Sequence, residues 1–243
     1  MSTTTEDSGR TTARMGLISR LVGTLTSPGA TFARVAGDPR PLGMLLLVML
    51  VSAVFIGGFF STEVGRQAFM DEQARRMEAF GRQMSPQQQR GMEMMLPYMA
   101  YLGAGQALVF IPVVTLVVSG LLLAVFNPFL GGRATFKQLF TVVVHSGAVI
   151  IVQQLFVWPL NYVRESMSSA TNLAVFLPML EENSFLTRLL GTIDLFIVWW
   201  TIVLAIGLSV LYRRKLTPIL ISFFIVYGAI AVGVAAFMRG GGS

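Results

Sequence analysis

The sequence of 243 residues contains no cysteine and only one histidine, His145. Without cysteine the chain can form no disulfide, no thiolate metal site and no cysteine nucleophile. A single histidine provides too few nitrogen ligands for a metal centre, and the chain shows no metal-ligand spacing and no nucleotide-binding loop. The sequence therefore predicts a protein with no metal ion and no other cofactor.

Charged residues are also scarce, at 12% of the chain, whereas hydrophobic residues make up 54%. Soluble domains carry about 25% charged residues, so this composition is typical of an integral membrane protein. The net charge of +6 would also fit a nucleic-acid-binding protein, but Lys and Arg beside apolar runs are the usual signature of oriented membrane spans. We therefore expect the chain to contact a lipid bilayer and no nucleic acid.

Five apolar runs approach the ~20 residues that a helix needs to cross about 30 Å of hydrocarbon. We place these spans at 41–60, 98–126, 139–162, 190–211 and 218–238. The first run is too long for a signal peptide, and no small-residue cleavage pattern follows it. The predicted fold class is all-α: an integral membrane bundle of five transmembrane helices, with N-terminal amphipathic interfacial helices and a helical extracytoplasmic loop.

The N-terminal forty residues divide into two segments before the transmembrane domain at 41–238. Residues 1–14 are polar and predict a disordered cytoplasmic tail. Residues 15–40 predict amphipathic interfacial helices, the first with a continuous apolar face and the second starting at Ser27-Pro28. The apolar face consists of Leu17, Ile18, Leu21, Val22 and Leu25. This segment is either a membrane-surface docking element or a plain interfacial anchor.

The first long connection, residues 61–97, predicts the helical extracytoplasmic loop. Ser85 and Gln88 match a capping box with a proline at the first helical position between them. Several methionines follow at the entry to the second span: Met92, Met94, Met95 and Met99. Thioethers can bind a cuprous ion, but without nearby His or Cys we favour a flexible apolar surface for a partner.

The stretch Asn127 to Ser146 carries the densest local signals in the chain. Asn127-Pro128 and Gly131-Gly132 predict a chain reversal after the second span. Thr135 with Gln138 then matches a capping box at the start of the next helix. The residues that we predict to form a cytoplasmic contact and orientation element are Gly131, Gly132, Arg133, Phe136 and Lys137.

The short connections decide the predicted orientation. The tail, the reversal and the connection after the fourth span hold ten of the 18 basic residues, and Arg213-Arg214-Lys215 alone supplies three cations. The loop at 61–97 instead balances five arginines with five acidic residues. Because basic short loops prefer the cytoplasm, we predict that the N-terminus is inside and the C-terminus outside.

Two ionisable side chains fall inside the predicted spans, His145 and Asp194. Such groups are functional candidates because a charge in hydrocarbon costs at least ~2.5 kcal/mol. At a rise of 1.5 Å per residue, however, the two lie about 15 Å apart in depth. We therefore expect no proton relay through both, and the simplest interpretation of His145 is a neutral ring bonded to a neighbouring helix.

Gln154 and Asn161 share one face of the third span and approach the depth of Asp194. This placement predicts an intramembrane polar cluster of Gln154, Asn161 and Asp194, joined by hydrogen bonds between helices. The alternative is that Asp194 serves helix packing, or pairs near the interface with Arg188 or Arg164.

Catalytic patterns are weak. Ser146 is adjacent to His145, and neighbouring side chains on a helix diverge by about 100°, so a serine–histidine dyad is not expected. The chain also lacks the G-x-S-x-G context of a serine hydrolase. We therefore predict that the protein is not an enzyme.

Two segments carry a resemblance to a known family, LVGTLTSPGATFARV at 21–35 and GGRATFKQLFTVVVHSG at 131–147. Together with five spans and an N-terminus inside, they make the chain similar to bacterial members of the YIP family over roughly 17–238. The resemblance implies a non-enzymatic five-span protein of trafficking or adaptor type in the bacterial cytoplasmic (inner) membrane. Some bacterial relatives are similar to accessory subunits of ABC exporters.

Two functional hypotheses follow. The first is an adaptor or assembly protein with a membrane-protein partner, for which an ABC exporter is one candidate. A second copy of the chain is another candidate partner, because Gly228, Ala231 and Ala235 form a small-residue face on the fifth span that suits close helix packing either within the bundle or between chains. The alternative hypothesis is a small permease or channel subunit that uses the polar residues of the third and fourth spans.

Overall fold

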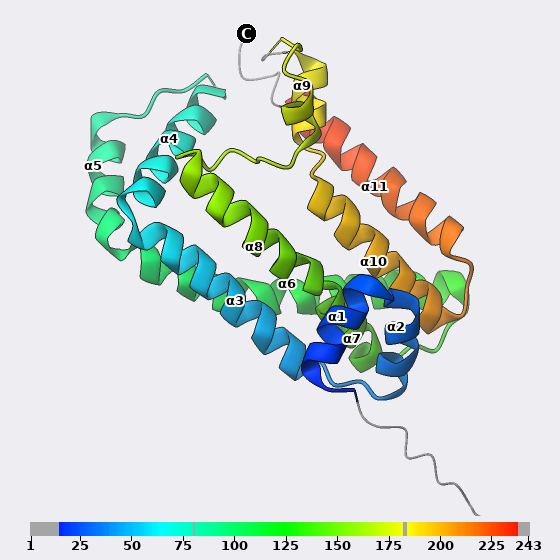
Figure 1. Cartoon of the computed structure of the whole chain (residues 1–243). Coiled ribbons are helices and arrows are strands. Elements are labelled where there is room, and N and C mark those ends of the chain that lie inside the picture. The colour runs from blue at the N-terminus through cyan, green and yellow to red at the C-terminus, as the bar shows by residue number, and fades with distance from the viewer. Residues whose placement is uncertain (1–14, 80, 182–183, 238–243) are drawn as a thin grey trace, which may run out of the picture.

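The computed structural model of the chain describes residues 15–79, 81–181 and 184–237. The helices are α1 (Leu17–Thr26), α2 (Pro28–Gly37), α3 (Leu42–Ser61), α4 (Glu63–Ala79), α5 (Pro86–Met95), η1 (Leu96–Tyr98), α6 (Met99–Leu130), α7 (Phe136–Ser146), α8 (Ala148–Val163), η2 (Leu173–Phe176), α9 (Phe185–Gly191), α10 (Leu195–Tyr212) and α11 (Leu216–Phe237). These ranges contain no strand, and the predicted all-α membrane bundle is confirmed (Figure 1).

Five helical segments are long and apolar enough to cross a membrane: α3, α6 with the helices before it, α7 with α8, α10 and α11. The segment of α7 and α8 is the most buried of the five, whereas α6 and α11 expose most of their apolar side chains. The exposed apolar surface of α6 and α11 therefore belongs at the lipid boundary, and α7 with α8 forms the centre of the bundle.

The sequence predicts a continuous third span at 139–162. In the structure this span consists of two helices, α7 and α8, that meet at Gly147. A Cβ atom at Gly147 would lie 2.9 Å from the Val144 carbonyl oxygen and 3.3 Å from a methyl group of Val48 on α3. The break therefore sits where α3 packs closely against the central span, and a side chain at Gly147 would force the two apart.

The second span extends beyond its predicted end at 126. In the structure α6 continues through Asn127-Pro128 and ends at Gly131, whose φ is +62°. Pro128 forfeits one helical hydrogen bond without stopping the helix, whereas a left-handed glycine is a common helix terminus. The 32 residues of α6 span about 48 Å at 1.5 Å per residue. Since the hydrocarbon core is about 30 Å thick, α6 must tilt or project from it, and Figure 1 shows it crossing α3 obliquely.

The fourth span begins later than the predicted residue 190. Ser184 caps the short helix α9, which precedes the span. The span itself, α10, starts at Leu195, and Asp194 is its N-cap. Asp194 therefore lies at the end of the span rather than inside it.

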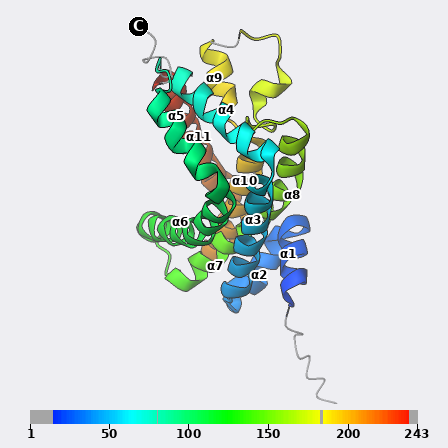
Figure 2. The same ribbon diagram turned by 90° about the vertical axis from the view of Figure 1, so that its left-hand side faces the viewer.

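The two views place the shorter helices at opposite ends of the bundle (Figures 1 and 2). At one end α1 and α2 lie beside α7, and α4, α5 and α9 lie at the other end, with α9 apart from α4 and α5 in Figure 1. Helix α1 turns Ile18 and Val22 outward, while Arg20 and Thr24 are buried against the protein. Leu21 and Leu25 of the predicted face pack against the bundle instead, so only Leu17, Ile18 and Val22 are placed to rest on lipid.

The two ends of the bundle differ in their charged residues. We call the α1, α2 and α7 end the basic end, because its described charges are eight cations and the single acid Asp38. Its cations are Arg20, Arg34, Arg40, Arg133, Lys137, Arg213, Arg214 and Lys215. Every other acid in the described part of the chain lies toward the opposite end, where arginines accompany the acids.

Candidate functional site at the basic end

The chain reversal between α6 and α7 is tied to the end of α10 by Asn127. The Asn127 carbonyl accepts hydrogen bonds from the N–H groups of Gly131 and Gly132, and its side-chain amide donates to the Ala134 carbonyl at 3.1 Å. The Tyr212 hydroxyl donates to Asn127 Oδ1 at 2.8 Å. A Cβ atom at Gly132 would lie 2.4 Å from the Tyr212 ring. Both predicted glycines are therefore used, one for a left-handed turn and one for close packing.

The predicted capping box at the start of α7 is confirmed. Thr135 Oγ1 accepts from the Gln138 N–H, and Gln138 Oε1 accepts from the Thr135 N–H at 2.9 Å. The side-chain nitrogen Nε2 of Gln138 also donates to the Ala36 carbonyl at 3.3 Å, and this bond joins α7 to the end of α2. The first turn of α7 is thus held from two sides.

Three predicted contact residues project from this braced turn, Arg133, Phe136 and Lys137, and we call them the contact surface. All three are exposed, and Phe136 keeps 40% of its surface accessible while its ring stacks on Phe140 with centroids 5.8 Å apart. Within the described ranges neither cation forms an ion pair. The arrangement offers an aromatic ring between two uncompensated positive charges.

Phe32 anchors α2 to the bundle behind the contact surface. Its side chain is fully buried, and its ring lies 3.2 Å from the position that a Cβ atom at Gly207 of α10 would take. The same position is 2.5 Å from a methyl group of Val142 on α7. Gly207 therefore leaves a notch where α2, α7 and α10 meet, and Phe32 fills it.

His145 is fully buried in the central span, apart from the contact surface. Its Nδ1 lies 2.8 Å from the Thr141 carbonyl of its own helix, so Nδ1 carries the proton. The predicted bond to a neighbouring helix is wrong, because the carbonyl four residues earlier is within reach on the same helix. Nε2 is buried and has no partner in the described part of the protein. Ser146 bonds to the Val142 carbonyl instead of to His145.

Asp194 holds the loop before α10 in place. Its Oδ1 accepts from the N–H groups of Phe196 and Ile197, which is the bonding of an N-cap. Its Oδ2 accepts from the hydroxyls of Ser169 at 3.0 Å and Thr171 at 2.6 Å. Both carboxylate oxygens are thus engaged in fixing the start of α10.

The predicted hydrogen-bonded cluster of Gln154, Asn161 and Asp194 does not form among the described residues. Gln154 accepts from the Trp158 ring one turn along α8, and the side-chain oxygen of Asn161 is buried without a partner. The cluster fails because Asp194 is a helix cap with its oxygens already occupied. The permease hypothesis, which needs these side chains in one path, gains no support from this geometry.

The small-residue face of the fifth span is used within the chain. Ala231 and Ala235 are buried, Gly228 is half-buried, and the Ala235 carbonyl accepts from Arg188 of α9 at 3.3 Å. A second copy of the chain as a partner stays a prediction.

Sequence reasoning missed the contacts that brace the contact surface. Asn127 and Tyr212 are 85 residues apart in the chain, and Gln138 and Ala36 are 102 apart. A local pattern marks each of these residues as a helix end but cannot show which ends meet. Gly207, a glycine inside an apolar run, was the one local indication that other helices pack closely against the fourth span.

A comparison with protein-family models finds a match over most of the chain. The model of the Yip1 domain matches residues 22–238, a range that contains α2, all five spans and the contact surface. No curated protein and no solved structure matches the chain.

Proposed function

The chain belongs to the Yip1 domain family, and from this premise we propose that it acts as an adaptor or assembly protein for another membrane protein. The family is one of non-catalytic membrane proteins, and membership is consistent with a role associated with membrane trafficking. The five apolar helical segments make the chain a multi-pass membrane protein.

The contact surface is the observation that carries the proposal. Aromatic and arginine side chains supply much of the binding energy at protein interfaces. Here Phe136 and Arg133 project from a turn that the Asn127–Tyr212 and Gln138–Ala36 hydrogen bonds hold in place. A surface that is already ordered loses little conformational entropy when a partner binds.

The charge of the contact surface indicates the chemistry of the partner. Arg133 and Lys137 lack ion pairs within the described ranges, so an acidic segment next to a transmembrane helix would complement them. An exporter subunit with such a segment is our candidate partner. Met94 and Met95 are exposed on the opposite end, and we propose that this methionine surface provides a second, adaptable contact.

Affinity capture in mild detergent tests the proposal. The full-length chain and its Arg133→Glu/Lys137→Glu variant would be purified from native membranes, and co-purified membrane proteins quantified by mass spectrometry. We expect one membrane protein to be enriched by the wild type and reduced at least tenfold by the charge reversal, because repulsion replaces attraction.

The matched control is Arg164→Glu, which reverses an exposed cation at the C-terminal end of α8, outside both proposed contacts. Retention of the partner by the control and loss by the double variant would support the proposed surface. Equal retention by all three proteins, or no enriched membrane protein in the wild type, would reject it.

We further propose that the basic end faces the cytoplasm of a bacterial inner membrane, with the N-terminus inside and the C-terminus outside. The excess of cations over acids at that end supports this orientation. Reporter fusions at Gly131 and Ser243 test it, and a cytoplasmic signal at Ser243 would contradict it.

A further inference from the structure

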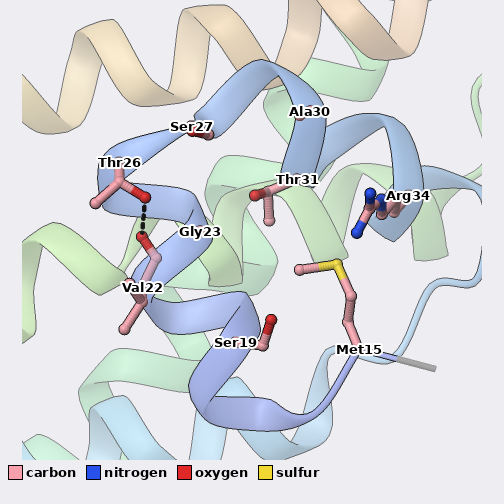
Figure 3. A pocket seen from close by; sticks show the side chains of 9 residues that line it. All are labelled: Met15, Ser19, Val22, Gly23, Thr26, Ser27, Ala30, Thr31 and Arg34. Carbon is pink, nitrogen blue, oxygen red and sulfur yellow. Dashed lines mark hydrogen bonds between the residues drawn. The ribbon is translucent and has the colours of Figure 1, made fainter. Parts of the chain in front are cut away.

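A pocket of about 340 Å³ lies between α1 and α2 at the basic end (Figure 3). Its walls include hydroxyl groups from both helices, those of Ser19, Thr26, Ser27 and Thr31. Arg34 reaches from α2 toward the space between the helices and lies beside Met15. The pocket thus combines a positive charge with several hydrogen-bonding groups, and neither the bundle packing nor the contact surface uses it.

Thr31 is the most informative residue of the pocket. Its side chain is only 3% exposed, yet its hydroxyl forms no hydrogen bond with any described residue. Figure 3 shows this hydroxyl turned toward α1, and a Cβ atom at Gly23 would come within 2.5 Å of it. Thr31 lines the pocket, and because its hydroxyl has no partner among the described residues, this hydroxyl can bond a group that enters the pocket.

The start of α2 adds further donors at the same place. Ser27 is its N-cap but makes no side-chain capping bond, and Pro28 has no N–H. In the described structure the N–H groups of Gly29 and Ala30 also have no acceptor. A helix N-terminus with free N–H groups favours an anionic oxygen ligand, above all a phosphate.

The surroundings of the pocket favour a lipid as the source of that phosphate. Val22 lines the pocket and also belongs to the outward apolar face of α1, where Ile18 is 66% exposed. A phosphate in the pocket would therefore sit at headgroup depth, with acyl chains along Ile18 and Val22. Arg34 has no ion pair within the described ranges and can bind one phosphate charge.

We propose that the α1–α2 pocket binds the phosphate of an anionic glycerophospholipid. Arg34 supplies the charge, and Thr31, Ser27 and the first N–H groups of α2 supply hydrogen bonds. The inference does not depend on the protein partner proposed above, because it concerns different residues and a different ligand.

Lipid titration of the purified full-length chain in detergent tests this inference, with bound lipid counted by native mass spectrometry. Dioleoyl phosphatidylglycerol is the probe and dioleoyl phosphatidylcholine the comparison lipid. We expect Arg34→Met to weaken phosphatidylglycerol binding about tenfold, since it removes the charge-assisted hydrogen bonds but keeps an apolar stem. Thr31→Val, which removes only the hydroxyl, should weaken it severalfold.

The control is Arg133→Met, which removes a cation from the same end but outside the pocket and should leave lipid binding unchanged. Arg34 is exposed, so its variant keeps the test valid even if Thr31→Val disturbs folding. A third arm adds inorganic phosphate. Equal binding of both lipids, equal loss in the Arg34 and Arg133 variants, or displacement of the lipid by millimolar phosphate would each overturn the proposal.

Discussion

The basic end and the α4–α5 hairpin are both built from short helices at the margin of the bundle, but they are stabilised differently. At the basic end, hydrogen bonds join segments 85 and 102 residues apart, and Phe32 fills a notch in α10. In the hairpin the side-chain bonds join residues at most five positions apart, as between Arg76 and Glu72 or Gln89 and Glu93. Helix α5 has no buried residue.

Charged side chains therefore have different roles in the hairpin and at the basic end. The first half of α4 packs on α3 through Ala68 and Phe69, and in its second half the charged groups neutralise one another locally, which supports the part of the helix with little tertiary packing. At the basic end packing supplies the support, so Arg34, Arg133 and Lys137 need no partner within the described chain to hold their helices. These cations are therefore available to ligands outside the protein.

The largest expected effect comes from removing the anchor of the basic end. Phe32→Ala should destabilise the protein by about 3–5 kcal/mol, because it leaves a cavity between α2, α7 and α10. Thermal unfolding in detergent, followed by scanning fluorimetry, measures the change. Phe136→Ala is the matched control, and since Phe136 is partly exposed it should shift the midpoint far less. Equal shifts for both variants would show that α2 is not packed as described.

An intermediate effect compares the two capping boxes. Thr135→Ala and Ser85→Ala each remove a side chain that accepts a hydrogen bond from the third residue of its helix, at a cost of about 1 kcal/mol. Hydrogen exchange should show faster exchange in α2 and α7 for Thr135→Ala, because Gln138 links them. For Ser85→Ala the faster exchange should stay within α5. Spread of the Ser85 effect into the spans would contradict the local character of the hairpin.

The smallest effect concerns the ion pairs of α4. Glu72 accepts from Arg75 at 3.1 Å and from Arg76 at 2.9 Å, and surface pairs of this kind contribute about 0.3–0.5 kcal/mol each. Glu72→Gln should therefore raise exchange in α4 slightly at low salt. The difference from wild type should shrink in 1 M salt, where such pairs are screened, and a salt-independent effect would argue for another role of Glu72.

The parts of the fold that the sequence predicts are those with local causes. Apolar length marks the five spans, and the capping boxes at Thr135 and Ser85 need only residues three positions apart. The left-handed terminus at Gly131 likewise follows from a single glycine. The contact surface could be predicted because it adjoins these signals.

The remainder depends on neighbours that are distant in sequence. Asp194 reads as a buried acid in an apolar run; its cap bonds to Phe196 and Ile197 are local, but the loop residues Ser169 and Thr171 that bind its other oxygen are 25 and 23 residues away. The pocket at Thr31 needs α1 and α2 to pack through Gly23, a contact between helices that periodicity does not encode. For the same reason the break at Gly147 was missed, since it depends on Val48 of α3.

The packing of Phe32 into the notch at Gly207 also has a consequence for biogenesis. The ring precedes the first span in the chain, yet the notch that receives it is formed by Val142 and Gly207, more than a hundred residues later. A ribosome makes the chain from its N-terminus, so α2 is complete long before its binding site exists. The amphipathic segment therefore stays at the membrane surface until the fourth span is made, and α2 cannot dock before that point.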